Sequence, residues 1–418
     1  MLQSHCLQTG FFPDDHTGEI LAAGLQEALD SWGLLEHRLV AITTDSGANI
    51  VKAVELNSWT RLQCFGHRLH IAIERAMKDD RIQRAVGVCK KIVAAFPYSW
   101  KKRRDLAIVQ EELGLPKHQL TTETPTRWGS CQMMIQRVLE QERAISQFLT
   151  ADRKTRNLIL RWQDVEALEA VNKVLNPLQD LTDALSGEHY VSVSYVKPVL
   201  HLFNNTILAE EEGDTQLVKD VKRNILVYLN EKYSDPHTDD LLDIASFLDP
   251  RFRTNYSKKE NVEDIICRAV EEIKSFEDQQ QDPLTGPSGA AAAAAEGPVG
   301  PPEEKRKKFL SSFFKKQFAG NMGCSTVTLT PEESIRMELR AYLHTTEVDS
   351  DADPLQWWRC HKANFPRVAK LAQRYLCIPA TSAPSERVFS TGGNIVTCHR
   401  AALKPDAVDH LVFLAQNL

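Results

Sequence analysis

The sequence predicts a mostly α-helical protein in which a small α/β core is followed by a large all-helical region. The run Leu39–Thr44 is short, apolar and rich in β-branched residues, which is typical of a buried strand in a partly parallel sheet. From Leu69 to about Phe276, apolar residues recur at helical spacing between prolines and short polar turns. A chain of 418 residues is too long for one ordinary core, so we expect two or three packed units.

The α/β core is predicted from the order of the first elements. We expect a strand at Leu2–Thr9, a helix at Ala22–Trp32, a strand at Leu39–Thr44, a helix at Ile50–Leu56 and a strand at Arg61–Phe65. Strands that alternate with helices in this way indicate an α/β arrangement. The first strand has two interpretations: a short edge strand, or part of a chain that is truncated at its N-terminus.

Two segments after the helical region differ from it in composition. Residues 279–302 contain a run of glutamines, a run of alanines and several prolines, which predicts a disordered linker or surface excursion. The basic run Lys305–Lys308 follows. It has two interpretations, a solvated charge run or a patch for nuclear import or phosphate contact.

The C-terminal segment predicts three helices. The first runs over Phe365–Leu376, and the second is expected over Pro384–Ser390 because Gly392–Gly393 would stop it. The last has Pro405 in its first turn. Its apolar stripe, broad enough to cover both a core and a partner, consists of Val408, Leu411, Val412, Leu414 and Ala415.

The composition is that of a soluble protein, with 42% hydrophobic and 25% charged residues. The formal net charge is −6, so any DNA contact must come from local basic patches. No apolar run approaches the roughly 18–20 residues that a membrane helix needs, so we expect no membrane partner. Nine cysteines are scattered without regular spacing, which favours reduced thiols in the cytosol or nucleus.

Asp45 is the first candidate for chemistry, because it follows a buried strand at the sheet edge where sites collect. Phosphoryl transfer by two divalent metals needs several such carboxylates. The alternative for an isolated aspartate at this position is a helix N-cap.

The string Cys64-Phe65-Gly66-His67-Arg68-Leu69-His70 offers one thiol and two imidazoles. Structural zinc usually needs four ligands from two separated pairs, and no partner pair lies nearby in the sequence. We therefore expect no zinc here, and favour a helix start at which Cys64 and His67 pack beside the acidic site.

Two basic strings have an aromatic neighbour. The first consists of Trp100, Lys101, Lys102, Arg103 and Arg104. It is either a DNA-binding patch or a solvated helix end. The second is Arg127–Trp128, in which an arginine and a tryptophan could contact a phosphate and stack on an unpaired base.

Five strings occur in one order along nearly the whole chain: Thr43–Ala53, Cys64–His67, Thr126–Trp128, Ala245–Phe252 and Ile378–Ser390. Together they resemble the hAT transposase superfamily, in particular the zinc finger BED domain-containing group of transposase-derived vertebrate proteins. Several separated motifs in order are far more specific than any one of them.

The resemblance implies an RNase H-like core interrupted by a large helical insertion. We expect a partial core at 1–75, the insertion at 76–278, a Pro/Ala-rich linker with a basic segment at 279–330, and a dimerisation region at 331–418 that completes the core.

The resemblance also implies roles for single residues. Asp45 and Glu386 look like the second and third of three ancestral metal-binding carboxylates, and both are expected to be vestigial. Cys64 with His67 matches the family's Cys-x-x-His, and Arg127–Trp128 matches an Arg-Trp pair that lies near the DNA end. Asp249 belongs to the fourth string.

Two features of the family pattern are absent from this sequence. The first catalytic aspartate belongs on a strand upstream of Met1, and the BED zinc finger is also missing. Without its first strands the sheet should be incomplete, because unpaired backbone groups of a buried strand are costly.

The leading hypothesis is a non-enzymatic nuclear protein that forms a homodimer, binds DNA and regulates transcription, with no membrane or small-molecule partner. The residues expected in dimerisation are Arg387, Phe389, Val408, Leu411, Val412 and Leu414. The alternative is an active nuclease that uses Mg²⁺ at Asp45 and Glu386, the only cofactor that we would expect. A SUMO-ligase role, described for close relatives, is a third possibility that no residue of the sequence identifies.

Overall fold

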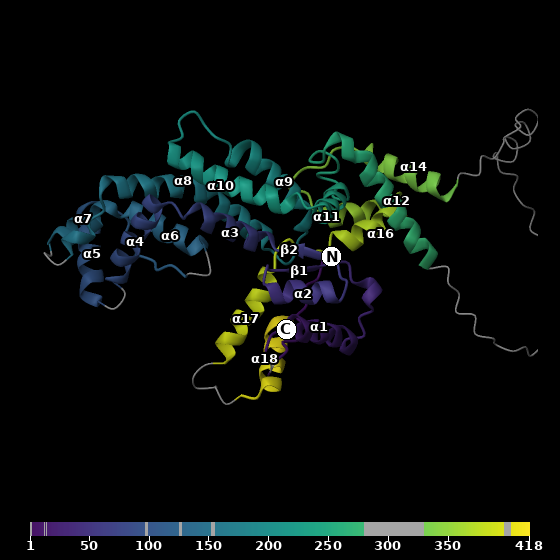
Figure 1. The fold of residues 1–418 in the computed structure, drawn as a ribbon, viewed down its shortest axis with the longest axis horizontal. Helices are drawn as coiled ribbons and strands as arrows, with labels where there is room; N and C mark the ends of the chain where they lie inside the picture. Colours follow the sequence, from purple (N-terminus) through teal and green to yellow (C-terminus); the bar gives the residue numbers. More distant parts are fainter. Residues whose placement is uncertain are drawn as a thin grey trace, which may run out of the picture.

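The structure is a computed structural model that describes residues 2–11, 13, 15–96, 99–124, 128–151, 155–279, 330–396 and 403–418. The molecule is elongated and mostly helical (Figure 1). A small α/β unit lies near its middle, and helical units extend from it toward the two ends.

The α/β unit contains two short parallel strands, β1 (Ile42–Thr44) and β2 (Arg61–Gln63). They pair in register, with Ile42 opposite Arg61 and Thr44 opposite Gln63. Helix α1 (Gly18–Ser31) packs on α2 (Ala48–Leu56), which connects the two strands. The strands predicted at Leu39–Thr44 and Arg61–Phe65 and the helices beside them are confirmed. The predicted burial of the first strand is wrong, because all three residues of β1 are half-buried.

The predicted strand at Leu2–Thr9 is wrong. Residues 2–10 belong to no strand, and the backbone groups of Cys6 and Thr9 bond instead to side chains of α18 (Pro405–Asn417). Cys6 N–H donates to Asn417 Oδ1 at 3.1 Å, and Thr9 N–H donates to Asp409 Oδ1 at 2.5 Å. These side chains satisfy the backbone groups that a neighbouring strand would otherwise satisfy.

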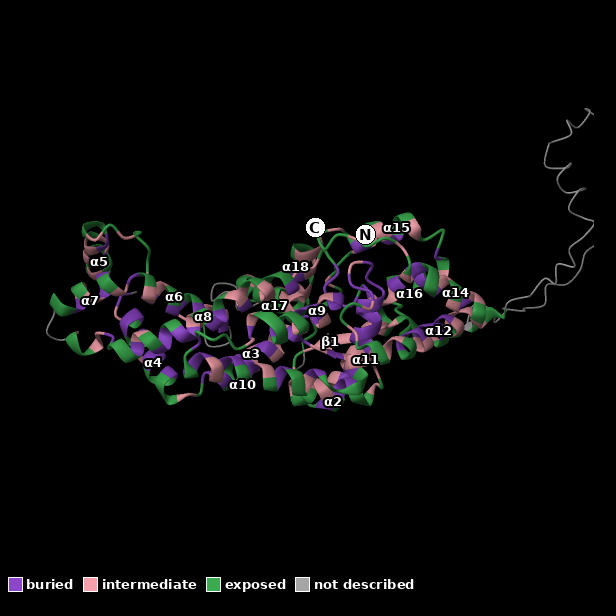
Figure 2. Cartoon of the chain, turned by 90° about the horizontal axis from the view of Figure 1, so that it is seen from above, coloured by how far each residue is buried: buried purple, intermediate pink, exposed green. Residues whose placement is uncertain are grey.

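The predicted all-helical region is confirmed. Its helices are α3 (Phe65–Ala76), α4 (Asp80–Ala94), α5 (Trp100–Glu112), α6 (Trp128–Glu140), α7 (Glu142–Ala151), α8 (Trp162–Leu185), α9 (Val196–Leu202), α10 (Gln216–Tyr233), α11 (Pro236–Phe247) and α12 (Val262–Gln279). The short 3₁₀-helices are η1 (Glu36–Arg38), η2 (Arg156–Leu158), η3 (Val193–Tyr195) and η5 (Lys259–Asn261), and η4 (Phe203–Ile207) is a π-helix. Helices α4, α6 and α10 all pack against α8, and buried residues run along them as one core (Figure 2).

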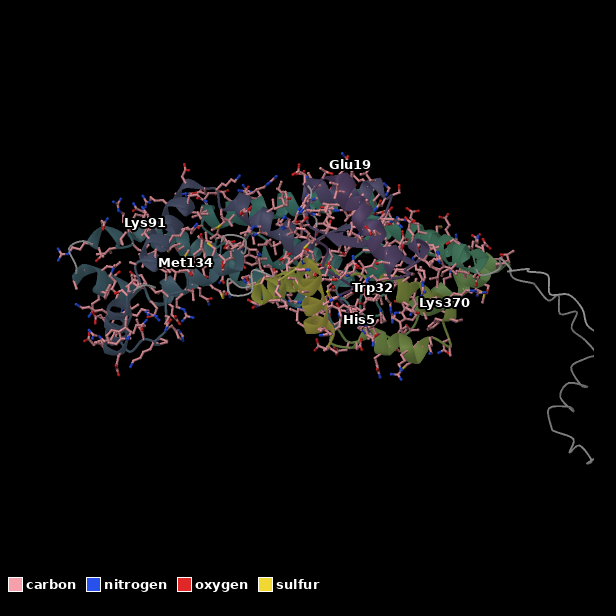
Figure 3. The ribbon with its side chains drawn as sticks, turned by 90° about the horizontal axis from the view of Figure 1, so that it is seen from below. His5, Glu19, Trp32, Lys91, Met134 and Lys370 are labelled. Atoms are coloured by element: carbon pink, nitrogen blue, oxygen red, sulfur yellow. The ribbon has the colours of Figure 1, made fainter. Side chains whose placement is uncertain are left out.

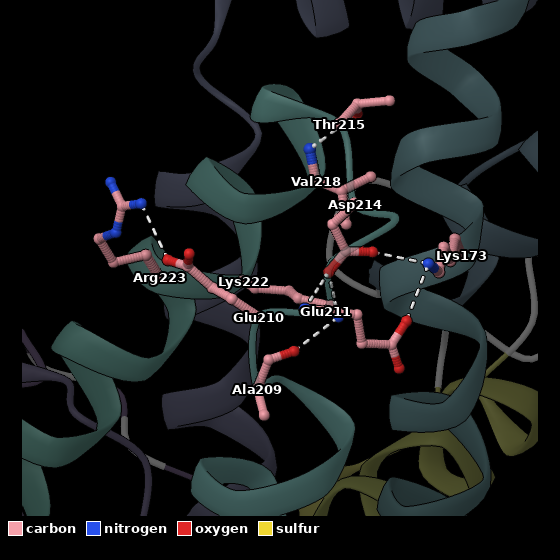
Figure 4. Close-up of polar contacts among 9 residues, drawn as sticks. All are labelled: Lys173, Ala209, Glu210, Glu211, Asp214, Thr215, Val218, Lys222 and Arg223. Atoms are coloured by element: carbon pink, nitrogen blue, oxygen red, sulfur yellow. Dashed lines mark hydrogen bonds and ion pairs between the residues drawn. The ribbon is translucent and has the colours of Figure 1, made fainter.

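A buried charge cluster fixes the loop between η4 and α10 (Figure 4). The carboxylate of Asp214 is fully buried and accepts hydrogen bonds from Lys222 Nζ at 2.7 Å and Lys173 Nζ at 2.6 Å. Lys222 Nζ also donates to the carbonyl of Ala209 at 2.8 Å. The loop is therefore held on both sides, by α8 through Lys173 and by α10 through Lys222.

The C-terminal helices join two different parts of the molecule. Helices α14 (Pro331–Leu343), α15 (Pro354–His361) and α16 (Pro366–Tyr375) pack near α11 and α12, whereas α17 (Ala383–Ile395) and α18 lie beside the α/β unit (Figure 1). The linker expected at 279–302 and the basic run Lys305–Lys308 lie almost entirely outside the described residues.

Helix α17 is longer than predicted. It continues through Gly392–Gly393 to Ile395, and neither glycine adopts a positive φ. Packing against α18 supports this extra turn, because Gln416 Nε2 donates to Thr391 Oγ1 at 2.8 Å. Gly33, in contrast, follows α1 with a φ of 62° and stops that helix as the sequence predicts.

In the described ranges, no helix combines the length and the apolar character that crossing a membrane would require. Every described cysteine is a free thiol.

Candidate functional site

A groove of about 1050 Å³ lies between the helical region and α17. Its walls come from α3, α5, α6, the end of α8 and the start of α17. The side chains that line it include His67 and His70 from α3, Glu386 and Arg387 from α17, and, from the helical region between them, Arg103, Lys117, Trp128 and Gln179.

Cys64 attaches the start of α17 to the start of α3. It is the N-cap of α3, and its sulfur accepts the backbone N–H of His67 at 3.4 Å. The same sulfur accepts the backbone N–H of Ser382 at 3.2 Å, and Phe65 N–H donates to the carbonyl of Ala380 at 2.9 Å. The helix-start interpretation of the Cys-x-x-His string is therefore confirmed.

These contacts place the Ile378–Ser390 string across the ends of the two strands. Thr43 Oγ1, on β1, donates to the carbonyl of Pro379 at 2.7 Å. Because Ser382 immediately precedes α17, the carboxyl group of Glu386 lies in the first helical turn, as the sequence predicts, and lines the groove. Ser382 Oγ donates to Glu386 Oε1 at 3.3 Å.

Two histidines of α3 lie on the groove wall beside Glu386. The rings of His67 and His70 are 6.2 Å apart. Burial lowers the pKa of His70, and the negative charges of Glu74 and Glu386 offset this only in part. Burial therefore favours the neutral form of His70, and its buried Nδ1 has no hydrogen-bond partner in the described structure.

Asp45 does not line this groove. Its carboxylate Oδ1 accepts the backbone N–H of Gly47 at 3.1 Å, and Gly47 is the N-cap of α2. Arg61 donates to the carbonyl oxygen of Asp45 at 2.5 Å. The N-cap interpretation is therefore wrong by two residues, and the acid closes the turn that precedes α2. Asp45 and Glu386 therefore do not line the same groove.

Across the described ranges, no three His, Cys, Asp or Glu side chains are grouped closely enough to share a metal ion.

The basic string at 100–104 forms the start of α5 and borders the groove. Trp100 is 67% exposed, and Arg104 lies over its ring with 5.0 Å between the guanidinium carbon and the ring centroid. Lys101 and Arg103 are exposed, Lys102 is half-buried, and Arg103 lines the groove. The structure shows an exposed helix start, which both interpretations of this string require.

Trp128 is not the free stacking platform that the sequence predicts. It begins α6 and is only 8% exposed, because its ring packs into the core of the insertion. One part of it reaches the groove lining. Its predicted partner, Arg127, lies outside the described residues.

Asp249, in the fourth string, lies in the core rather than at the groove. Its side chain is fully buried and accepts hydrogen bonds from Ser194 Oγ at 2.7 Å and Arg251 Nε at 2.9 Å. Arg251 continues the network to Tyr195 Oη at 2.6 Å. The string therefore has a structural role in holding η3 to the end of α11.

Sequence reasoning missed the polar side of α8 that lines the groove. Gln179, Thr182, Asp183 and Ser186 all line it, at positions i, i+3, i+4 and i+7 of one helical face. A polar stripe at this spacing is the signal that could have identified them. The loop residues Lys117–Thr122 line the groove without any recognisable motif.

Two family models match the chain. Residues 62–174 match a model described as the ZBED1 RNase-like helical domain, and residues 338–418 match the hAT family C-terminal dimerisation region. The first match supplies the α3, α5 and α6 walls of the groove, and the second supplies the α17 wall.

Relatives along almost the whole chain agree with these matches. Human zinc finger BED domain-containing protein 4 is 25% identical over 97% of this chain, and mouse zinc finger BED domain-containing protein 6 is 23% identical over 94%. The putative AC transposase of Zea mays is 23% identical over 97%. The chain is therefore similar to hAT transposase-derived proteins of the zinc finger BED type.

The hAT-derived chain spans only part of these relatives. It covers 33% of the human protein, 42% of the mouse protein and 52% of the maize transposase.

The dimerisation region of the hAT-derived chain has both buried and exposed apolar residues. Val412 is 1% exposed, whereas Phe389, Leu411 and Leu414 are 72%, 38% and 47% exposed. Val408 is half-buried. The stripe thus covers the core through Val412, as the sequence predicts, and its remaining leucines are exposed. Arg387 lies instead at the groove, where it pairs with Glu188 and donates to the carbonyl of Ser186 at 2.8 Å.

Proposed function

We propose that this hAT-derived chain is a nuclear, homodimeric DNA-binding protein without nuclease activity, which regulates transcription. The observation that carries the proposal is the groove, because it joins the helical region to the dimerisation region and three cations, Arg103, Lys117 and Arg387, line it against two acids, Asp183 and Glu386. Dimerisation is assigned to the residues that match the family's dimerisation region.

The charge of the groove supports an anionic ligand. Arg103 and Lys117 lie on the insertion side and Arg387 on the α17 side, while Lys101 extends the positive charge along α5. The whole chain has a formal net charge of −6, so this local concentration of cations is what would attract a phosphodiester backbone. Hydroxyl and amide groups of α8 would supply hydrogen bonds to sugar or base.

We propose that β1, β2 and their helices belong to an RNase H-like core, in a chain divided into the regions 1–75, 76–278, 279–330 and 331–418. The contact of Thr43 with Pro379 supports this division, because it joins the last region to the first strand of the sheet. In this arrangement the segment after residue 376 completes the core and carries Glu386 to it.

The absence of nuclease activity is proposed from the placement of the two ancestral acids. Two-metal phosphoryl transfer needs carboxylates that share the metals. Asp45 Oδ1 closes the turn before α2, and Glu386 faces the groove instead. Incubation of this chain with Mg²⁺ and hAT terminal-repeat DNA should give no cleavage. Cleavage that Asp45→Ala or Glu386→Ala abolishes would establish the nuclease alternative.

DNA binding is tested by charge reversal at the groove. We expect Lys101→Glu/Arg103→Glu to weaken binding to a labelled duplex about tenfold or more in fluorescence anisotropy, and to reduce its salt dependence, because phosphate contacts release counterions. The control is Lys259→Glu, a charge reversal at an exposed site of η5 away from the groove. Equal affinities of the groove variant and the control would contradict the assignment.

A further inference from the structure

The loop that follows α5 forms one rim of the groove. Residues 115–124 belong to no helix or strand. Four of them that are exposed and line the groove are Lys117, Thr121, Thr122 and Thr124. A group attached to one of these side chains would therefore stand where the proposed DNA ligand must lie.

Thr124 is held by its backbone, which leaves its side chain free. Its N–H donates to Ser130 Oγ at 2.7 Å, and Ser130 Oγ donates to the carbonyl of Thr124 at 3.0 Å. Within the described part of the chain, the hydroxyl of Thr124 forms no hydrogen bond of its own. The hydroxyl is therefore accessible to a modifying enzyme without any rearrangement of the fold.

The same loop is also attached to α4. Glu123 Oε1 pairs with Lys90 Nζ at 2.5 Å, and the side chain of Glu123 is only 17% exposed. Figure 3 labels Lys91 of α4 and Met134 of α6, which lie in the same end of the elongated molecule. Because the loop is anchored to both helices, Thr124 keeps a defined place at the groove.

Thr124 begins the string Thr124-Pro125-Thr126-Arg127. A threonine followed by proline, with a basic residue at the third position after it, is the pattern that proline-directed protein kinases select. Proline also restrains the residue before it to an extended backbone, which is the form in which a kinase binds its substrate. Residues 125–127 lie outside the described residues, so only their sequence contributes to this pattern.

A second Thr-Pro pair, Thr330–Pro331, lacks both features. The residue at its third position is an acid, Glu333. Its hydroxyl is also engaged in the capping box of α14, where Thr330 Oγ1 accepts the backbone N–H of Glu333 at 3.2 Å and donates to Glu333 Oε2 at 3.0 Å. The two pairs therefore give opposite expectations for the same kinase.

A phosphate on Thr124 would invert the charge of the groove. Apart from the histidines, the charged residues that line it are three cations and two acids, namely Arg103, Lys117, Arg387, Asp183 and Glu386. A phosphothreonine carries a charge of about −1.5 to −2 at pH 7. This charge exceeds the single excess positive charge of the lining, so the modified groove would repel a phosphodiester backbone.

We propose that Thr124 is a phosphorylation site of a proline-directed protein kinase, and that its phosphorylation prevents DNA from binding in the groove. The inference rests on the proposed DNA binding and adds its regulation. The kinase transfers the γ-phosphoryl group of ATP to Thr124 Oγ1. The bond from the γ-phosphorus to the bridging oxygen breaks, ADP leaves, an O–P bond forms, and the hydroxyl proton passes to the catalytic aspartate of the kinase.

The site is tested by incubating the 418-residue chain with ATP and a purified proline-directed kinase that prefers a basic residue at the third position. Phosphopeptide mapping by mass spectrometry should find phosphate on Thr124 and none on Thr330. Thr124→Val, which keeps the shape of the side chain and removes the hydroxyl, should lose this phosphate. An unmodified Thr124, in a reaction where the kinase phosphorylates its standard peptide substrate, overturns the site.

The effect on the groove is tested by fluorescence anisotropy with a labelled duplex. We expect the phosphorylated chain to bind about tenfold more weakly, or worse, than the untreated chain. The matched control is Thr124→Val, whose affinity should be the same with and without kinase treatment. Circular dichroism should show the same helical content before and after phosphorylation, and a loss of helix would overturn charge as the cause.

The outcomes separate this regulation from the proposed function. An untreated chain that binds no duplex overturns the proposed DNA binding and its regulation, while the mapping still decides whether Thr124 is a kinase site. An untreated chain that binds the duplex, with equal affinity after phosphorylation of Thr124, overturns the regulation alone.

Discussion

Replacing Asp249 by asparagine tests whether the fourth string of the family pattern holds the core together. The change keeps the shape of the side chain and removes its charge. Asp249 is 0% exposed and accepts hydrogen bonds from Ser194 Oγ and from the backbone N–H, Nε and Nη2 of Arg251. An asparagine would leave the guanidinium of Arg251 buried without its counter-charge.

The expected cost follows from that burial. The side chain of Arg251 is 5% exposed, so solvent cannot replace the lost carboxylate. Breaking a buried pair by removing one partner costs about 3–5 kcal/mol. We expect a loss of this size in the free energy of unfolding, measured by urea denaturation followed by circular dichroism.

The control for this measurement is Asp220→Asn. Asp220 belongs to an exposed pair with Arg223, and such pairs contribute about 0–1 kcal/mol. A second test is a double-mutant cycle with Arg251→Met. The double variant should lose less than the sum of the single variants, because no unpaired charge remains. If Asp249→Asn costs no more than Asp220→Asn, the buried pair does not hold the core.

Two further substitutions test other contacts. Asp214→Asn should cost about 3–5 kcal/mol in the same assay, because Lys222 would be left buried. Burial raises the pKa of Asp214, but hydrogen bonds from Lys173 and Lys222 outweigh this and hold the pKa well below its ordinary value. The stabilisation that ionised Asp214 provides is therefore fully present above about pH 4 and is lost as the pH falls toward the lowered pKa. The difference in the free energy of unfolding between wild type and Asp214→Asn should therefore shrink in acid. Cys64→Ala should cost about 1–2 kcal/mol and speed amide exchange at Ser382, whereas Cys64→Ser, which keeps an acceptor, should preserve much of that protection; equal exchange in both variants would show that the sulfur does not anchor α17.

Much of the secondary structure could be predicted from the sequence. The buried run before Asp45 became β1, and helical spacing identified the insertion, because periodicity records which face of an element is buried. The strand predicted at Leu2–Thr9 failed, since an extended apolar segment does not specify whether its backbone bonds to a strand or to side chains of α18.

The candidate site was predicted only in pieces. The ordered strings identified the family resemblance and included Cys64 and Glu386, which both lie at the groove. They did not separate the groove residues from the core residues, since Trp128 and Asp249 proved to be buried. A sequence motif shows that particular residue types recur at a position. It does not show whether the side chain there is buried in the core or exposed at a site, because that depends on the residues packed around it.

The sequence by itself determined the order of the elements, the family and the apolar stripes. Only the tertiary structure decided that Cys64 bonds to Ser382, that Asp45 faces a turn while Glu386 faces the groove, and that residues 2–10 bond to side chains of α18. Each of these contacts joins residues that lie far apart in the chain or depends on which neighbours surround a side chain. Local periodicity shows only which face of a helix or strand is buried. Which other element packs against that face is decided by the folding of the whole chain.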